Sequence, residues 1–249
     1  MKKILAIILQ DFYRTLRHPN RGVLPILLYG LICYLGVVLG YSRLIPEING
    51  TETVQWMIPN LVMFAILLLS YQHATWEIAG KEQTGYLTYL RSTQVTPVLL
   101  AISYVLDGIL RSLIKSVLIV LLFWVLWGSL GSVRFWVIFY GVAFLASLFW
   151  AGLGVSLALW IRKSSVNSHF FAEIIIPVFL VSGFLYPVTL YPPMVELVTY
   201  LLPAAPAFYL GRSVFSPGEW NLWISAGLIG WSILGLVLTY VSLKDEEQR

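Results

Sequence analysis

Charged residues are scarce in this sequence of 249 residues. Only 11% of them are Asp, Glu, Lys or Arg, whereas 59% are hydrophobic and the mean hydropathy is +0.82. A soluble domain carries about 25% charged residues, so the composition argues against a soluble protein. Lipid admits only helices and closed barrels, because every backbone polar group must be satisfied inside the protein. The long apolar runs favour helices.

Other absences narrow the range of functions. The single cysteine, Cys33, excludes an internal disulfide. An ATP-binding phosphate loop requires G-x-x-x-x-G-K-[ST]. Here the only Gly-Lys pair, Gly80 and Lys81, is followed by Glu82, and Thr75 stands where the first glycine belongs. The three histidines are scattered without the spacing of metal ligands. We therefore expect no cofactor in this chain and no catalytic activity of its own.

What the sequence does contain is six apolar runs, and a run of about twenty residues matches a hydrocarbon core of roughly 30 Å. The predicted spans are Gly22 to Tyr41, Val54 to His73, Leu110 to Leu130, Phe135 to Ile161, Ser168 to Leu185 and Trp220 to Leu243. The third helix begins near Pro97, and its charges suggest that its first half stays near the surface. The predicted fold is an all-α integral membrane protein with one domain, residues 1–249.

The N-terminal segment, residues 2–17, has the pattern of an amphipathic helix. Apolar residues repeat every four positions on one side and basic residues lie on the other, as in helices that lie in the membrane interface. The alternative is the cytoplasmic start of the first span. The apolar stretch is too short for a signal peptide, so we expect it to be retained.

Lys and Arg are distributed unevenly. With the N-terminus inside, all but three of the sixteen fall on inner segments, and the exceptions are Arg43, Arg134 and Arg212. The positive-inside rule then places both termini in the cytoplasm. Several tryptophans fall at predicted interfaces, as in an aromatic belt: Trp56, Trp127, Trp136, Trp220 and Trp223.

The inner interval, residues 76–97, is too polar to enter lipid and too short to form a domain. A short helix here would lie outside the membrane and offer apolar residues to a cytoplasmic partner. An ordinary solvated loop fits the interval equally well.

The outer interval, residues 186–219, holds half of the twelve prolines and is nevertheless apolar. Proline breaks helices, so this segment cannot span the bilayer as one helix. It can form re-entrant half-helices if protein covers their free backbone groups. The alternative is an interfacial loop that plugs the bundle.

The order of these elements resembles the permeases of type-2 ABC exporters (the ABC-2 family), which handle drugs, oligosaccharides and lipid-linked polysaccharides. The most specific pieces are EQTGYLTYLRSTQVTP at residues 82–97, and residues 182–212, which open with SGFLYP. The resemblance implies that residues 2–17 form a connecting helix. It implies a coupling helix that seats in an ATPase subunit, with Glu82, Gly85, Tyr86, Leu87, Tyr89, Leu90 and Arg91. It implies an outer gate with Ser182, Gly183, Tyr186, Pro187, Pro192, Pro193 and Arg212.

The resemblance also implies partners. Such permeases work as two copies that face each other, with an ATPase subunit under each, so ATP and Mg would be bound by the partner chain. It implies contact with membrane lipid and an export cargo in a prokaryotic cytoplasmic membrane. We expect no nucleic-acid partner.

Ionisable residues within spans are the remaining candidates. Asp107, Arg111 and Lys115 share one helix face, and Asp to Arg at i+4 is a favourable pair. We interpret them as a solvated cytoplasmic face. Glu173 follows His169 by one turn, and we favour a pair near the cytoplasmic surface over a proton relay.

Possible pathway residues are Tyr29, Tyr34 and Glu173, although ordinary packing explains the tyrosines equally well. Two other function classes stay open. An intramembrane lipid-modifying enzyme would use Glu173, His169 or Asp107, and an ion-coupled carrier would need inverted repeats and acidic residues at mid-membrane. We find no close catalytic pair and no such repeat in the sequence.

Overall fold

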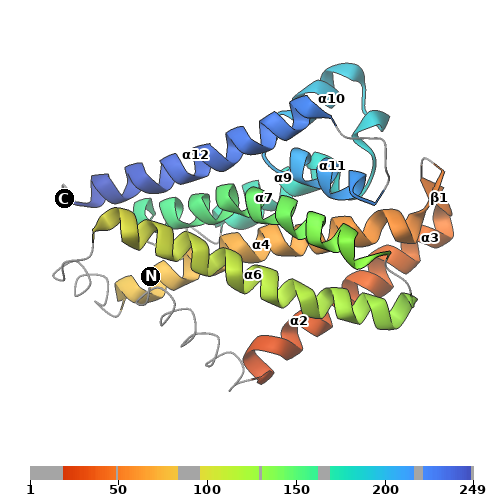
Figure 1. The fold of residues 1–249 in the computed structure, drawn as a ribbon, viewed down its shortest axis with the longest axis horizontal. Helices are drawn as coiled ribbons and strands as arrows, with labels where there is room; N and C mark the ends of the chain where they lie inside the picture. Colours follow the sequence, from red (N-terminus) through yellow and green to blue (C-terminus); the bar gives the residue numbers. More distant parts are fainter. Residues whose placement is uncertain are drawn as a thin grey trace.

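A computed structural model describes residues 19–48, 50–83, 96–128, 131–161, 169–215 and 221–247 (Figure 1). Within these residues the protein is a bundle of long helices, with one two-stranded hairpin as its only sheet. This confirms the predicted all-α membrane fold. The predicted interfacial helix, residues 2–17, lies outside the described residues.

The first span is a helix with a change of winding inside it. Helix α2 (Pro19–Cys33) continues as a π-helical stretch, Tyr34–Leu39, and then as α3 (Gly40–Leu44). The short strands β1 (Glu47–Ile48) and β2 (Thr51–Glu52) follow, antiparallel, with Glu47 opposite Glu52. Gly50 has a positive φ of 74° in this turn, a conformation that glycine adopts without steric cost.

Four long helices form the body of the bundle: α4 (Thr53–Gln83), α6 (Pro97–Trp127), α7 (Val133–Trp160) and α12 (Leu222–Glu247). Helix α4 corrects the predicted organisation. The second span was expected to end at His73, but the helix runs ten residues further. The residues after His73 include several good helix formers (Ala, Glu, Lys and Gln). A helix also needs no lipid around it to continue.

The segment between α7 and α12 is broken, as its prolines predict. After a run of α and π turns, Phe171–Phe184, come a 3₁₀ turn (Val188–Leu190), α10 (Pro193–Tyr200) and α11 (Ala205–Ser213). The last two are apolar and meet at 90°, a geometry that fits a re-entrant loop or a broken span. The described helix of the predicted fifth span ends at Phe184 and is shorter than the other spans.

The described part of the chain has five helices long and apolar enough to cross a membrane, and a sixth if α10 and α11 count as one span. These helices run lengthwise through the bundle, which therefore has two opposite ends (Figure 1). We call the end with β1, β2, α3 and α10 the hairpin end. The ends of α4, α7 and α12 and the start of α6 lie at the opposite end, the tail end. That the hairpin end faces outward stays a prediction.

Helices α4 and α7 are mostly buried, whereas α2, α6 and α12 expose apolar faces. Glycines allow the closest backbone approaches. Gly152 of α7 and Gly235 of α12 leave no room for a Cβ between the two helices, and a Cβ on Gly154 would lie 2.6 Å from the Tyr71 carbonyl of α4. The exposed faces of α2, α6 and α12 require lipid or another protein to cover them.

Candidate functional site

The predicted coupling helix lies almost wholly outside the described residues. The structure places Glu82 in the last turn of α4 and describes nothing of its side chain or of Gly85, Tyr86, Leu87, Tyr89, Leu90 and Arg91. What it does describe are the two helices that flank this segment. Helix α4 ends at Gln83, just after the first coupling residue, and α6 begins at Pro97, after the last one, both at the tail end (Figure 1).

At the hairpin end, two predicted gate residues come together, Gly183 and Arg212, while the Ser182 hydroxyl donates to the Val178 carbonyl of its own helix. Arg212 Nη1 of α11 donates to the Gly183 carbonyl at 2.7 Å and to Asn60 Oδ1 at 3.3 Å. Asn60 Nδ2 of α4 in turn donates to the Phe184 carbonyl at 3.1 Å. Asn60 is 1% exposed. We call this group, Asn60, Gly183, Phe184 and Arg212, the latch.

Local backbone conformation explains why the latch forms here. Gly183 has φ 82° and ψ 24°, which ends the helical run after Ser182. A helix end leaves carbonyls without backbone partners and carries partial negative charge. The Arg212 guanidinium and the Asn60 amide satisfy two of these carbonyls. Since a Cβ at residue 183 would also come within 2.5 Å of the Val188 side chain, glycine is required on two grounds.

The other predicted gate residues lie along the same turn. Pro187 precedes the 3₁₀ turn, and Pro192 and Pro193 begin α10, where a missing amide hydrogen costs nothing. The Tyr186 ring contacts the Tyr191 ring edge to face, with centroids 6.2 Å apart. These residues shape the turn that follows the broken helix.

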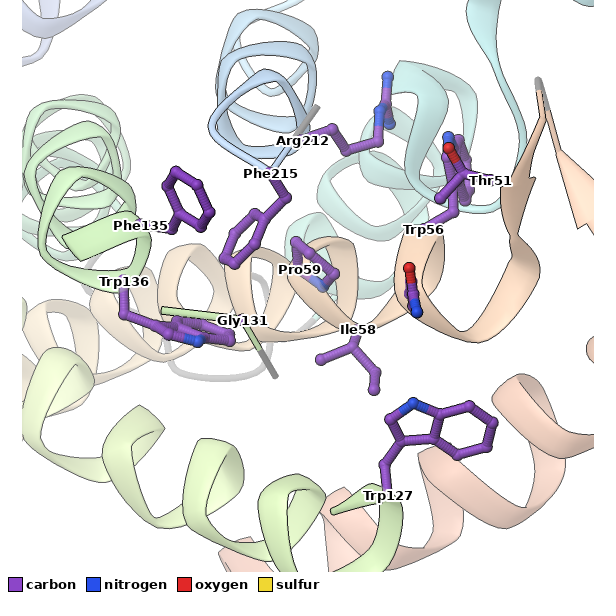
Figure 2. A pocket seen from close by; sticks show the side chains of 11 residues that line it. Thr51, Trp56, Ile58, Pro59, Trp127, Gly131, Phe135, Trp136, Arg212 and Phe215 are labelled. Atoms are coloured by element: carbon purple, nitrogen blue, oxygen red, sulfur yellow. The ribbon is translucent and has the colours of Figure 1, made fainter. Parts of the chain in front are cut away.

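A partly open cavity of about 310 Å³ lies beside the latch (Figure 2). It is lined from the start of α4, the end of α6, the start of α7 and the end of α11. Three of the predicted belt tryptophans line it: Trp56, Trp127 and Trp136. Arg212 lines it too, and its guanidinium carbon lies 4.7 Å from the centre of the Trp56 ring, a cation–π contact.

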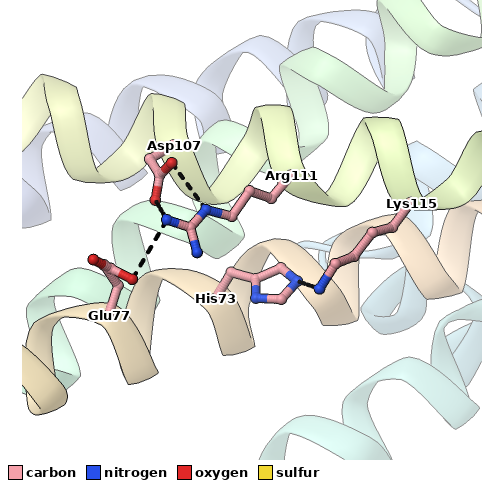
Figure 3. A network of polar contacts seen from close by, with 5 residues as sticks. All are labelled: His73, Glu77, Asp107, Arg111 and Lys115. Carbon is pink, nitrogen blue, oxygen red and sulfur yellow. Dashed lines mark hydrogen bonds and ion pairs between the residues drawn. The ribbon is translucent and has the colours of Figure 1, made fainter. Parts of the chain in front are cut away.

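A second polar cluster joins α4 to α6 nearer the tail end (Figure 3). Arg111 binds Asp107 through two contacts of 2.9 Å, as the i+4 spacing predicts, and reaches Glu77 of α4 at 3.5 Å. One turn away, Lys115 Nζ lies 2.8 Å from His73 Nε2. We call these five side chains the charge network. It crosses between the helices at two successive turns.

The charge network corrects the interpretation of Asp107, Arg111 and Lys115 as a solvated face. Asp107 is only 4% exposed, and all three side chains point toward α4 rather than away from the bundle (Figure 3). Gly108 allows this proximity, because a Cβ there would lie 3.1 Å from the Ser70 carbonyl of α4. Helix α6 begins at Pro97, as predicted.

The three possible pathway residues are placed differently from one another. Tyr34 is buried and packs against Phe123 with ring centroids 5.8 Å apart, so ordinary packing accounts for it. Tyr29 is partly exposed. Glu173 and His169 form a 3.5 Å pair on the surface of the chain, with both side chains about three quarters exposed.

Sequence reasoning missed Asn60, His73 and Glu77. Asn60 had a usable signal, since an isolated amide in an apolar span is costly unless it binds a partner. His73 and Glu77 are four residues apart on α4, which matches the spacing of the charges on α6. Recognising that match requires knowing which faces of the two helices meet.

A comparison with protein-family models matches residues 2–216 to a family described as ABC-2 type transporter. No curated protein matches the chain. The matched region covers all described elements through α11, including the latch, the charge network and both flanks of the predicted coupling helix. The chain therefore belongs to the ABC-2 type transporter family and is a multi-pass membrane permease component of an ABC transporter.

Proposed function

We propose that this chain is the permease subunit of an ATP-driven exporter. Two copies would form the pathway, and a separate ATPase subunit docked on each would bind ATP and Mg and supply the energy. The cargo would be an amphipathic, lipid-linked or glycan molecule that leaves the cytoplasm. The permease makes and breaks no bond in the cargo.

The observation that carries this proposal is the continuity of α4. Helix α4, Thr53–Gln83, contains both the latch residue Asn60 and the first predicted coupling residue, Glu82. At 1.5 Å per residue, these two residues lie about 33 Å apart along the helix. A push on its tail end therefore reaches the hairpin end without crossing a loop.

The charge network supports the same proposal. It ties the last third of α4 to the middle of α6. A force on that segment would then act on a pair of helices that moves as one unit. The latch lies at the far end of the pair, where α4 holds the broken fifth helix.

The surface of the chain supports a pathway between two copies. Glu173 and His169 are exposed beside the apolar Ile174 and Val181. An ionisable pair facing lipid is costly, whereas a water-filled path between two copies would solvate it. Facing copies would also cover part of the exposed apolar surface.

The proposal is tested with the complex of this chain and its ATPase. Co-purification of an ABC ATPase, with hydrolysis that responds to cargo, is the first expected result. The variant Glu82→Arg should then keep basal hydrolysis but lose both cargo stimulation and export. Glu47→Arg is the matched control, since Glu47 is exposed at the opposite end. Full stimulation and full export by Glu82→Arg, and by variants that remove the apolar patch at residues 86–90, would refute the coupling role.

A further inference from the structure

The cavity at the hairpin end has two unlike sides. Phe135, Trp136 and Phe215 lie together and form an aromatic side, whereas Trp127 lies apart from them and Trp56 lies beside Thr51 (Figure 2). The polar lining comes from Thr51, Gln55 and Arg212. Among the described lining residues Arg212 is the only charged one, and it is a cation. Such a lining suits a ligand that is apolar in one part and anionic in another.

The volume and position of the cavity further restrict the kind of ligand that it can bind. A volume of about 310 Å³ corresponds to roughly ten molecules of liquid water. It is at the small end of ligand sites, which span about 300 to 1,000 Å³. It therefore accepts a headgroup with the adjoining part of one chain rather than a whole lipid. The tryptophans around it are of the kind that lies at the level of lipid headgroups.

We propose that this cavity binds an anionic phospholipid from the surrounding leaflet. The phosphate would lie toward Arg212, with Gln55 and Thr51 as hydrogen-bonding groups, and the start of an acyl chain would pack on the aromatic side. Since Arg212 also holds the Gly183 carbonyl, an occupied cavity would place the lipid phosphate next to the latch. The inference goes beyond the proposed export function and needs neither ATP nor cargo.

The binding is measured by tryptophan fluorescence of the full chain in vesicles. Two vesicle preparations contain the same mixture of phosphatidylglycerol and phosphatidylcholine, with bromine on the acyl chains of one lipid or of the other. Bromine quenches nearby indoles, so brominated phosphatidylglycerol should quench more than brominated phosphatidylcholine. Trp136→Phe should remove part of this excess, whereas Trp223→Phe should not, because Trp223 lies on α12 and is 84% exposed.

The decisive test changes the charge at residue 55 and measures the preference for the anionic lipid. Gln55 is exposed in the first turn of α4, where a glutamate is compatible with the helix dipole. Gln55→Glu should lower the preference for the anionic lipid roughly two- to fivefold, the range of an exposed charge pair. Gln55→Lys should raise the preference. Asn221→Asp adds the same charge at the start of α12, outside the cavity lining, and should leave the preference unchanged.

Two results would overturn the inference. Equal quenching by both labels would show that the cavity does not prefer an anionic headgroup. An equal loss of preference in Gln55→Glu and Asn221→Asp would show that the preference belongs to the general surface potential. Neither result bears on ATP-driven export, so the two proposals fail separately.

Discussion

The charge network and the latch both bind α4 to its neighbours, but they are built from different groups. In the charge network, ionised side chains face one another across two continuous helices. In the latch, an arginine and an amide bind backbone carbonyls at a point where a helix is interrupted. The charge network connects two uninterrupted helices, whereas the latch requires that a helix is interrupted.

This difference has a mechanical consequence. Separating α4 from α6 would leave the pair Asp107 and Arg111 intact, because both lie on α6. It would break the contact of Arg111 with Glu77 and that of Lys115 with His73. Opening the latch would free carbonyls at a helix end beside a partly open cavity, where water or a lipid headgroup can replace the lost donors. Helix α4 is therefore held nearer its tail end by contacts between side chains of two helices, and at its hairpin end by contacts with carbonyls that other donors can replace.

The largest loss of stability is expected from removing the central cation of the charge network. Arg111→Leu takes the bidentate partner from buried Asp107 and a contact from Glu77. Breaking a buried ion pair on one side costs about 3 to 5 kcal/mol. Thermal unfolding of the purified chain in detergent should show this loss of stability.

The double variant Asp107→Leu/Arg111→Leu is the informative companion. It removes both charges, so it should be more stable than Arg111→Leu alone. Arg43→Leu serves as the control, since Arg43 is exposed in α3, and it should change little. Equal stability of Arg111→Leu and Arg43→Leu would mean that the network holds nothing together.

A smaller effect is expected at the latch. Asn60→Leu and Arg212→Leu each remove a donor from a carbonyl, and each should cost about 1 to 3 kcal/mol. Because Asn60 and Arg212 also bind each other, the double variant should cost less than the sum of the two single costs. A double-mutant cycle of unfolding free energies measures this coupling. Strict additivity would contradict the latch as a connected unit.

Much of the fold could be predicted, because long apolar runs have few alternatives in lipid. The proline content predicted the broken outer segment, and the i+4 spacing predicted the pair Asp107 and Arg111. Gly183 and Arg212 were both expected to matter from the family resemblance. Their direct contact was not, since it depends on how α11 folds back against the fifth helix.

The sequence does not show which faces of which helices pack against each other. The charges on α6 suggested a solvated surface because polarity along one helix does not reveal what packs against it. The end of the second span was placed at His73 because hydropathy falls there, yet helix formation does not follow hydropathy. The role of Asn60 depends on the Phe184 carbonyl, which is 124 residues away in sequence.

The smallest loss of stability is expected from the pair Lys115 and His73, the simplest part of the charge network. Lys115 and His73 share one contact of 2.8 Å. Lys115→Met removes a partly buried charge and its desolvation cost together with that contact, so the net loss should be at most about 1 kcal/mol. His73→Phe leaves the ammonium in place without this acceptor and should cost more. Unfolding measurements on the two variants establish the order. The reverse order would show that the Lys115 ammonium stabilises the protein by more than its contact with His73.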